Sequence, residues 1–95
     1  MIAMMLDLKG DTDQLRKAYR ASNDELQKQG HFEGLVFHTA GPTATGFRIV
    51  DVWRSRELFE KFAQRMIPIA QKNGMGGDAR PEIWDVESTM NVPSS

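Results

Sequence analysis

The chain has 95 residues, a length that suits one small domain. Its 12 basic and 13 acidic residues are dispersed and give a net charge of -1, so no basic face is expected for nucleic acid or for an acidic membrane surface. It contains no cysteine, which excludes disulfides, thiolate catalysis and thiolate metal sites.

The N-terminal apolar run covers only residues 1–6 and lacks the basic flank and cleavage site of a signal peptide. No segment approaches the roughly 20 apolar residues that a membrane span requires. We therefore expect a cytoplasmic protein without a membrane partner.

The first predicted elements are a strand and a helix. Residues 1–8 are apolar without a helix start signal, which is typical of a buried strand. Residues 11–14 can accept the free amide hydrogens of a helix N-terminus, and Gly30 is a natural terminator, so a helix is expected over residues 13–29. Its apolar stripe comprises Leu15, Ala18, Tyr19, Ser22 and Leu26.

A hairpin, a second helix and a last strand are predicted next. Residues 34–40 and 47–53 are rich in branched and aromatic side chains, and residues 41–46 have the composition of a turn. Ser55 is placed to cap a helix that carries an apolar stripe from Leu58 to Ala70, with Pro68 expected to kink or interrupt it. Residues 74–78 are predicted to form a flexible connector that could act as a lid, residues 81–88 a strand, and residues 91–95 a frayed tail beyond a domain of residues 1–90.

The predicted order is β-α-β-β-α-β, which gives an α+β fold with a four-stranded antiparallel sheet. Two helices can cover only one face of such a sheet, and a chain this short buries only about two-thirds of its unfolded surface. We therefore expect a homodimer that forms through the open sheet face.

The central part of the chain also carries a recognisable pattern. It contains a His-bearing strand, an Ala-Gly-Pro turn, a strand ending in Asp-Val-Trp, and a capped helix with a late proline, in the segment GLVFHTAGPTATGFRIVDVWRSRELFEKFAQRMIPIAQKNG. This pattern resembles small bacterial proteins of the dimeric α+β barrel (ferredoxin-like) superfamily, related to antibiotic-biosynthesis monooxygenases and polyketide cyclases. The resemblance covers residues 31–74 closely and the rest of the chain in element order.

The resemblance implies a sheet-to-sheet dimer and a pocket between the sheet and the helices of each subunit. The superfamily includes cofactor-independent monooxygenases, polyketide cyclases, small lyases and isomerases, and haem-binding enzymes, and fold alone does not choose among them. The Asn, Trp and His constellation of the haem-degrading branch is not matched here. We therefore expect no cofactor, and we keep haem binding as a further alternative.

His38 is the best candidate for chemistry, because it lies within a predicted strand and imidazole titrates near neutral pH. Asp51 lies on the adjacent strand, where a modest turn length would place it opposite or diagonal to His38 and let it orient the ring. Trp53 shares a strand face with Asp51 and could form an aromatic wall. Two histidines without paired spacing argue against a metal site.

The remaining candidates are substrate contacts. Phe37 is predicted to shape the pocket together with Trp53, while Tyr19 could donate its hydroxyl to a ligand and Met66 lies on the inward stripe of the second helix. Core packing is the alternative role for Tyr19, Trp53 and Met66, since large apolar side chains bury area readily. Likewise, His38 and Asp51 could simply satisfy each other in a core.

The sequence thus predicts a cofactor-independent enzyme acting on an aromatic or polyketide-like small molecule. His38 would transfer a proton with support from Asp51, in a cyclisation, isomerisation, oxygenation or hydrolysis. The alternative is a non-catalytic homodimer that binds a small ligand or is purely structural. A pocket that opens onto His38 would favour the enzyme.

Overall fold

The computed structural model describes residues 1–75 and 79–90. It contains the predicted six elements in the predicted order: β1 (Ile2–Lys9), α1 (Thr12–Lys28), β2 (Leu35–Thr43), β3 (Gly46–Trp53), α2 (Arg56–Lys72) and β4 (Glu82–Asp85). The tail 91–95 and residues 76–78 of the predicted connector lie outside the described residues. Neither of the helices in the described part of the chain is long and apolar enough to cross a membrane.

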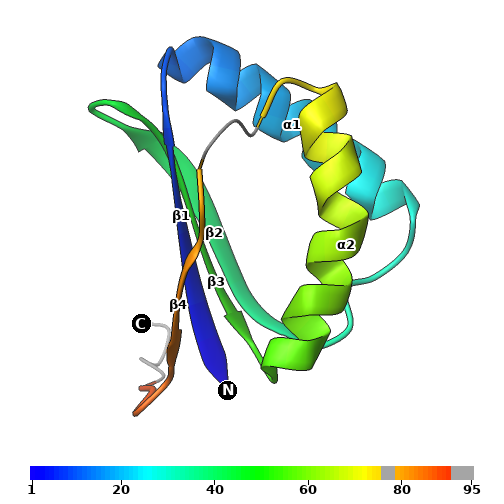
Figure 1. The fold of residues 1–95 in the computed structure, drawn as a ribbon, viewed down its shortest axis with the longest axis vertical. Helices are drawn as coiled ribbons and strands as arrows, with labels where there is room; N and C mark the ends of the chain where they lie inside the picture. Colours follow the sequence, from blue (N-terminus) through cyan, green and yellow to red (C-terminus); the bar gives the residue numbers. More distant parts are fainter. Residues whose placement is uncertain (76–78, 91–95) are drawn as a thin grey trace, which may run out of the picture.

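The four strands form one antiparallel sheet in the order β2-β3-β1-β4, which confirms the predicted ferredoxin-like architecture. Figure 1 shows α1 and α2 packed on the same side of this sheet, and no other described helix or strand covers its opposite side. The molecule therefore has two layers, and its core lies between them.

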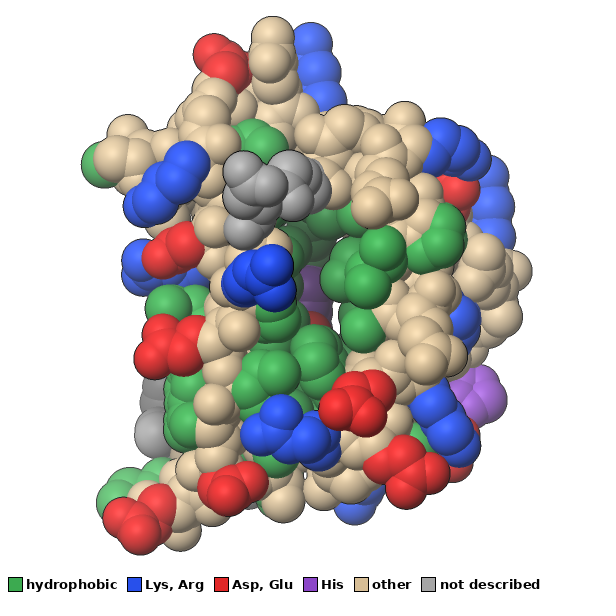
Figure 2. All heavy atoms as spheres, in the orientation of Figure 1, with side chains coloured by type: hydrophobic (Ala, Val, Ile, Leu, Met, Phe, Trp, Pro, Cys, Tyr) green, Lys and Arg blue, Asp and Glu red, His purple; other side chains and the backbone are tan. Residues whose placement is uncertain are grey.

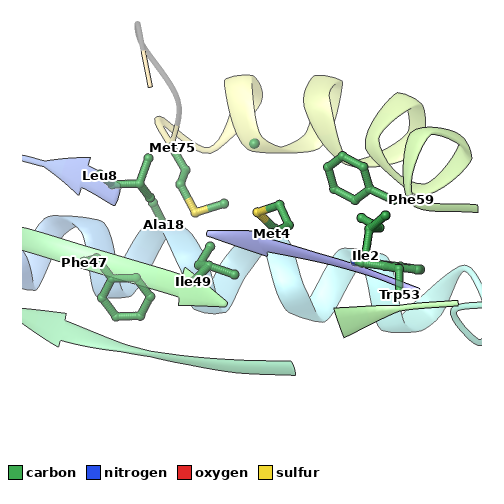
Figure 3. Packing of buried hydrophobic residues seen from close by; sticks show 10 residues of the cluster. Ile2, Met4, Leu8, Ala18, Phe47, Ile49, Trp53, Phe59 and Met75 are labelled. Carbon is green, nitrogen blue, oxygen red and sulfur yellow. The ribbon is translucent and has the colours of Figure 1, made fainter. Parts of the chain in front are cut away.

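Both helices begin where capping residues satisfy free backbone amides. The Asp11 carboxylate accepts a hydrogen bond from the Gln14 amide at 2.9 Å, and the Ser55 hydroxyl accepts one from the Leu58 amide at 3.1 Å. Each helix then directs one apolar stripe toward the sheet. The core that results is shown in Figure 3 and includes Ile2, Met4, Leu8, Ala18, Phe47, Ile49, Trp53, Phe59, Ala70 and Met75.

The hairpin differs from the prediction. Residues 41–46 were expected to form the turn, but β2 continues through Gly41, Pro42 and Thr43, and only residues 44 and 45 separate the two strands. Proline is tolerated here because β2 is an edge strand, where a missing amide hydrogen breaks no central ladder. Composition therefore marked the turn region correctly but overestimated its length.

Two other predicted boundaries also change. Helix α2 runs from Arg56 to Lys72 without the interruption that was expected at Pro68. The two residues that follow this proline, Ile69 and Ala70, are buried in the core. Proline removes only one hydrogen bond, and core packing on the turn that follows holds the helical path. Strand β4 covers four residues rather than residues 81–88, because it pairs only with residues 2–5 of β1.

Candidate active site

Strand β3 places two candidate residues on the face of the sheet that meets the helices. Side chains alternate between the faces of a strand, so Asp51 and Trp53 point the same way. Both are buried, with 2% of Asp51 and 0% of Trp53 exposed. A buried carboxylate needs hydrogen-bond partners, which makes the surroundings of Asp51 informative.

Both oxygens of the Asp51 carboxylate have a partner. His38 lies directly opposite Asp51 in the β2–β3 pairing, and its Nδ1 is 2.5 Å from Oδ1. The Trp53 indole Nε1 donates to Oδ2 at 3.3 Å. The carboxylate is therefore held from two sides and fixes the orientation of the imidazole.

Helix α1 adds a third member to this chain of contacts. The Tyr19 hydroxyl is 2.5 Å from Nε2 of His38, and the two rings are within 5° of the same orientation. A carboxylate can only accept, so Nδ1 of His38 carries the hydrogen that is donated to Asp51. In the neutral imidazole this tautomer leaves Nε2 as the acceptor, to which the Tyr19 hydroxyl donates.

Two effects raise the pKa of Tyr19 above its usual value. The larger is desolvation by burial, and the smaller is the negative charge of Asp51. Both disfavour the phenolate, so the hydroxyl keeps its proton at neutral pH. Tyr19 is thus a hydrogen-bond donor in the resting site.

These side chains line a cavity of about 150 Å³ between the two layers. Figure 2 shows a hollow between the segment that carries β4 and helix α2, bordered by hydrophobic side chains. The wall is mostly apolar, and the His38 side chain is 33% exposed. The complete lining comprises Met4, Leu6, Tyr19, Ser22, Asn23, Leu26, Gln27, Phe32, Leu35, His38, Ile49, Asp51, Trp53, Phe62, Met66 and Met75.

Five of the six predicted site residues meet in this cavity: Tyr19, His38, Asp51, Trp53 and Met66. The structure separates Phe37 from them, and this expectation must be corrected. Adjacent strand residues point to opposite faces, so a strand that directs His38 toward the helices directs Phe37 away from them. Phe37 is 57% exposed and pairs with Val52 on the open face.

The pocket also contains residues that were not predicted from the sequence, among them Asn23 and Gln27. Asn23 and Gln27 follow Tyr19 by four and eight residues, which places all three on one side of α1. This spacing was visible in the sequence. However, polar side chains beside an apolar stripe more often face solvent, so the spacing alone did not indicate a pocket.

The site does not suit haem or a metal cluster. Both ring nitrogens of His38 are already hydrogen-bonded, so neither is free to bind iron without breaking a contact. Among the described residues, no group of three His, Asp or Glu side chains is arranged to hold a metal ion.

No protein-family model matches the chain, and no curated protein matches it in sequence. Solved structures do resemble it. A candidate antibiotic biosynthesis monooxygenase from Deinococcus radiodurans superposes with a TM-score of 0.69 at 11% identity, covering 99% of this chain and 100% of the other. The monooxygenase ActVA-Orf6 of Streptomyces coelicolor, crystallised with nanaomycin D, gives a TM-score of 0.66 at 13% identity, with coverage of 98% and 91%.

A third structure extends the same pattern. SnoaB, a cofactor-independent oxygenase from Streptomyces nogalater studied as its N63A mutant, gives a TM-score of 0.64 at 12% identity, with coverage of 94% and 93%. At these identities the likeness concerns the fold. The chain therefore has the ferredoxin-like β-α-β-β-α-β fold found in antibiotic-biosynthesis monooxygenase-like proteins.

Proposed function

We propose that the protein is a cofactor-independent enzyme that removes a proton from an aromatic or polyketide-like small molecule, with His38 as the base. One observation carries the proposal. An unbroken series of hydrogen bonds runs from the buried Asp51 carboxylate through His38 to the Tyr19 hydroxyl at the cavity wall. We call these three residues the relay.

The geometry suggests how the proton moves. Nε2 of His38 is occupied by Tyr19, so a substrate bound in the cavity meets the phenol oxygen. As Tyr19 accepts the substrate proton, its own proton passes to Nε2, and the new imidazolium is stabilised by Asp51. Tyr19 never has to become a free phenolate, which its raised pKa disfavours.

Oxygenation is the reaction class that the structural neighbours favour, since several are described as monooxygenases or oxygenases. Proton removal from an activated CH₂ group leaves a carbanion. Dioxygen, the co-reactant, adds to that carbon and takes back the relay proton to give a hydroperoxide. Loss of water then leaves C=O, so the carbon is oxidised while dioxygen is reduced to one carbonyl oxygen and one water molecule.

The alternative of a purely structural His38 explains less of the geometry. A histidine that only satisfies Asp51 would need neither access to solvent nor a third partner. Here the His38 side chain is one-third exposed, and Tyr19 extends the contact toward the cavity. If the relay variants leave turnover unchanged, the alternative of a non-catalytic ligand-binding protein is supported.

We further propose that two copies of the chain pair through the open sheet face. One row of side chains on this face crosses all four strands in register: Phe37, Val52, Ala3 and Trp84. Phe37 and Trp84 are 57% and 45% exposed. An apolar row of this kind gains stability when a partner excludes water from it.

The proposed reaction is tested by dioxygen uptake with a panel of hydroxylated anthrones, which carry the activated CH₂ group that the reaction requires. We expect His38→Asn to lower kcat/KM by about 100-fold or more, the usual contribution of a positioned acid-base group. Asp51→Asn should give a loss of similar order, because the ring would lose its fixed tautomer. Mass spectrometry of the product should show the CH₂ group converted to C=O.

His31→Asn is the matched control, because His31 is exposed and lies outside the cavity. It should retain wild-type turnover. If His38→Asn is as active as His31→Asn, the relay has no catalytic role. A wild type that consumes no dioxygen with any panel member would contradict the oxygenation step.

A further inference from the structure

A second cavity, of about 280 Å³, lies between α2, β1 and the segment that leads into β4. It is lined by Met4, Leu6, Leu8, Phe59, Ala63, Met66, Ile67, Ala70, Gln71, Met75, Ala79 and Pro81. No member of the relay lies in it. We call it the distal chamber, and the cavity at the relay the proximal chamber.

The two chambers adjoin each other. Both are lined by Leu6 and by three methionines, Met4, Met66 and Met75, so these side chains form the boundary between the chambers. Figure 3 shows Met4 and Met75 in the space between β1 and α2. Methionine has three rotatable bonds and adapts to irregular shapes, so this boundary can rearrange around a ligand that crosses it.

The chamber volumes limit what can be bound. A cavity of about 150 Å³ holds roughly one benzene molecule. The proximal chamber alone therefore accommodates a single ring. Ligand sites commonly begin at about 300 Å³, a size that is reached only when the distal chamber is included.

The lining also limits the charge of the ligand. Among the described residues that line the two chambers, none is Lys or Arg, and the only acid is Asp51, which is already paired. Among the described residues that line the distal chamber, only Gln71 has a polar side chain. A carboxylate or phosphate there would lose its hydration without gaining a cation.

We infer that the distal chamber binds the remote part of the substrate, and that this part is apolar and uncharged. The ligand is then a neutral molecule larger than a single aromatic ring, with its acidic group at Tyr19 and its apolar remainder beyond the three methionines. The placement of the acidic end rests on the proposed function. The size and neutrality of the remote end rest on the chamber alone.

Calorimetric titration of the full chain with two phenols tests the chamber. Methyl 6-hydroxy-2-naphthoate has two rings, and methyl 4-hydroxybenzoate has one. Ala63 lines only the distal chamber. Ala63→Phe should therefore raise the dissociation constant of the naphthoate ester by about tenfold or more, and should change that of the benzoate ester by no more than about twofold. Ala21→Phe, at an exposed position of α1 outside both chambers, is the matched control and should bind both esters as the wild type does.

A second pair of ligands tests neutrality. The free acid, 6-hydroxy-2-naphthoate, differs from its methyl ester only at the remote end. We expect the ester to bind about 100-fold more tightly than the carboxylate, because none of the described residues that line the chamber supplies a compensating cation. Equal affinity would overturn the inference, as would an Ala63→Phe protein that binds the naphthoate ester like Ala21→Phe.

The failures of the two proposals are separable. If His38→Asn abolishes turnover while Ala63→Phe behaves like Ala21→Phe, the proposed binding role of the distal chamber is wrong and the catalytic role of the relay stands. If Ala63→Phe and the ester-acid pair behave as expected while His38→Asn stays active, the chamber stands and the relay fails. Should Ala63→Phe not fold, Ile67→Phe at the exposed edge of the same chamber replaces it, with the same expected loss.

Discussion

Tyr19 connects the chemistry of the site to its packing. Its ring lies against Phe47 in the core, with centroids 5.0 Å apart, while its hydroxyl contacts His38. The apolar stripe on α1 favoured a core role for Tyr19. The structure shows that the Tyr19 side chain both packs in the core and contacts His38. A tyrosine can do so because its apolar ring ends in a polar group.

The titration of Tyr19 can be observed directly, since it is the only tyrosine in the chain. Absorbance of tyrosinate near 295 nm should show a midpoint above 10.0, because burial and the charge of Asp51 both oppose the phenolate. Asp51→Asn should move the midpoint downward, whereas Asp24→Asn, at an exposed position of α1, should not. A wild-type midpoint at or below the ordinary value would contradict the assigned environment.

The same raised pKa predicts how stability depends on pH. The unfolded chain releases the Tyr19 proton near pH 10, before the folded chain does. The folded state therefore binds more protons above that pH, and the free energy of unfolding falls as the pH rises from about 10 through the folded pKa. Denaturant titrations should show that the free energy of unfolding falls less between pH 9 and pH 11 in Tyr19→Phe than in the wild type.

At the scale of elements, the register of the hairpin determines the site. Only residues 44 and 45 separate β2 from β3, and this short loop sets His38 opposite Asp51. A shift of one residue would turn one of the two side chains to the other face. The irregular pairing between Leu35 and Phe37 then lets both Leu35 and His38 face the cavity.

Gly46 is the residue that allows β3 to start so close to β1. A Cβ atom at this position would lie 1.8 Å from the backbone carbonyl oxygen of Leu8, which cannot move without disturbing β1. We expect Gly46→Ala to lower the free energy of unfolding by about 3 kcal/mol, measured by urea denaturation.

Gly41 in the same hairpin is the matched control. A Cβ atom there would meet nothing within 4 Å, so Gly41→Ala should change the free energy of unfolding by only about 0.5 kcal/mol. Equal effects of the two substitutions would show that the close approach of β1 and β3 does not limit the residue at position 46.

At the scale of the whole molecule, the two faces of the sheet have different roles. The face toward the helices carries His38 and Asp51 and borders both chambers, while the open face carries the apolar row of Phe37, Val52, Ala3 and Trp84. A charge in that row should prevent pairing of two copies, because burying it without a partner is costly.

Sedimentation equilibrium provides the test of this pairing. We expect the wild type to be dimeric. Phe37→Lys should shift the equilibrium toward the monomer and raise the dissociation constant of the dimer by at least about tenfold. Met90→Lys replaces another exposed apolar residue, outside the sheet, and should leave the dimer intact. A monomeric wild type would refute the proposed homodimer.

The sequence by itself determined the element order, the Ser55 cap of α2, the region in which α1 begins, the inward stripes, and the shared face of Asp51 and Trp53. These follow from local spacing, because helices repeat every 3.6 residues and strands every two. Alternation also implies that Phe37 and His38 point to opposite faces, so the predicted pocket containing both was inconsistent with strand geometry.

Only the tertiary structure decided which face of the sheet meets the helices, and hence that Asp51 is buried rather than solvated. It alone placed Tyr19, which is 19 residues from His38 in the chain, against Nε2, and it alone formed the two chambers from helix and strand side chains. The physical reason is that local spacing fixes which side chains of one element share a face. The packing of the layers selects which face is buried and what lies across from it.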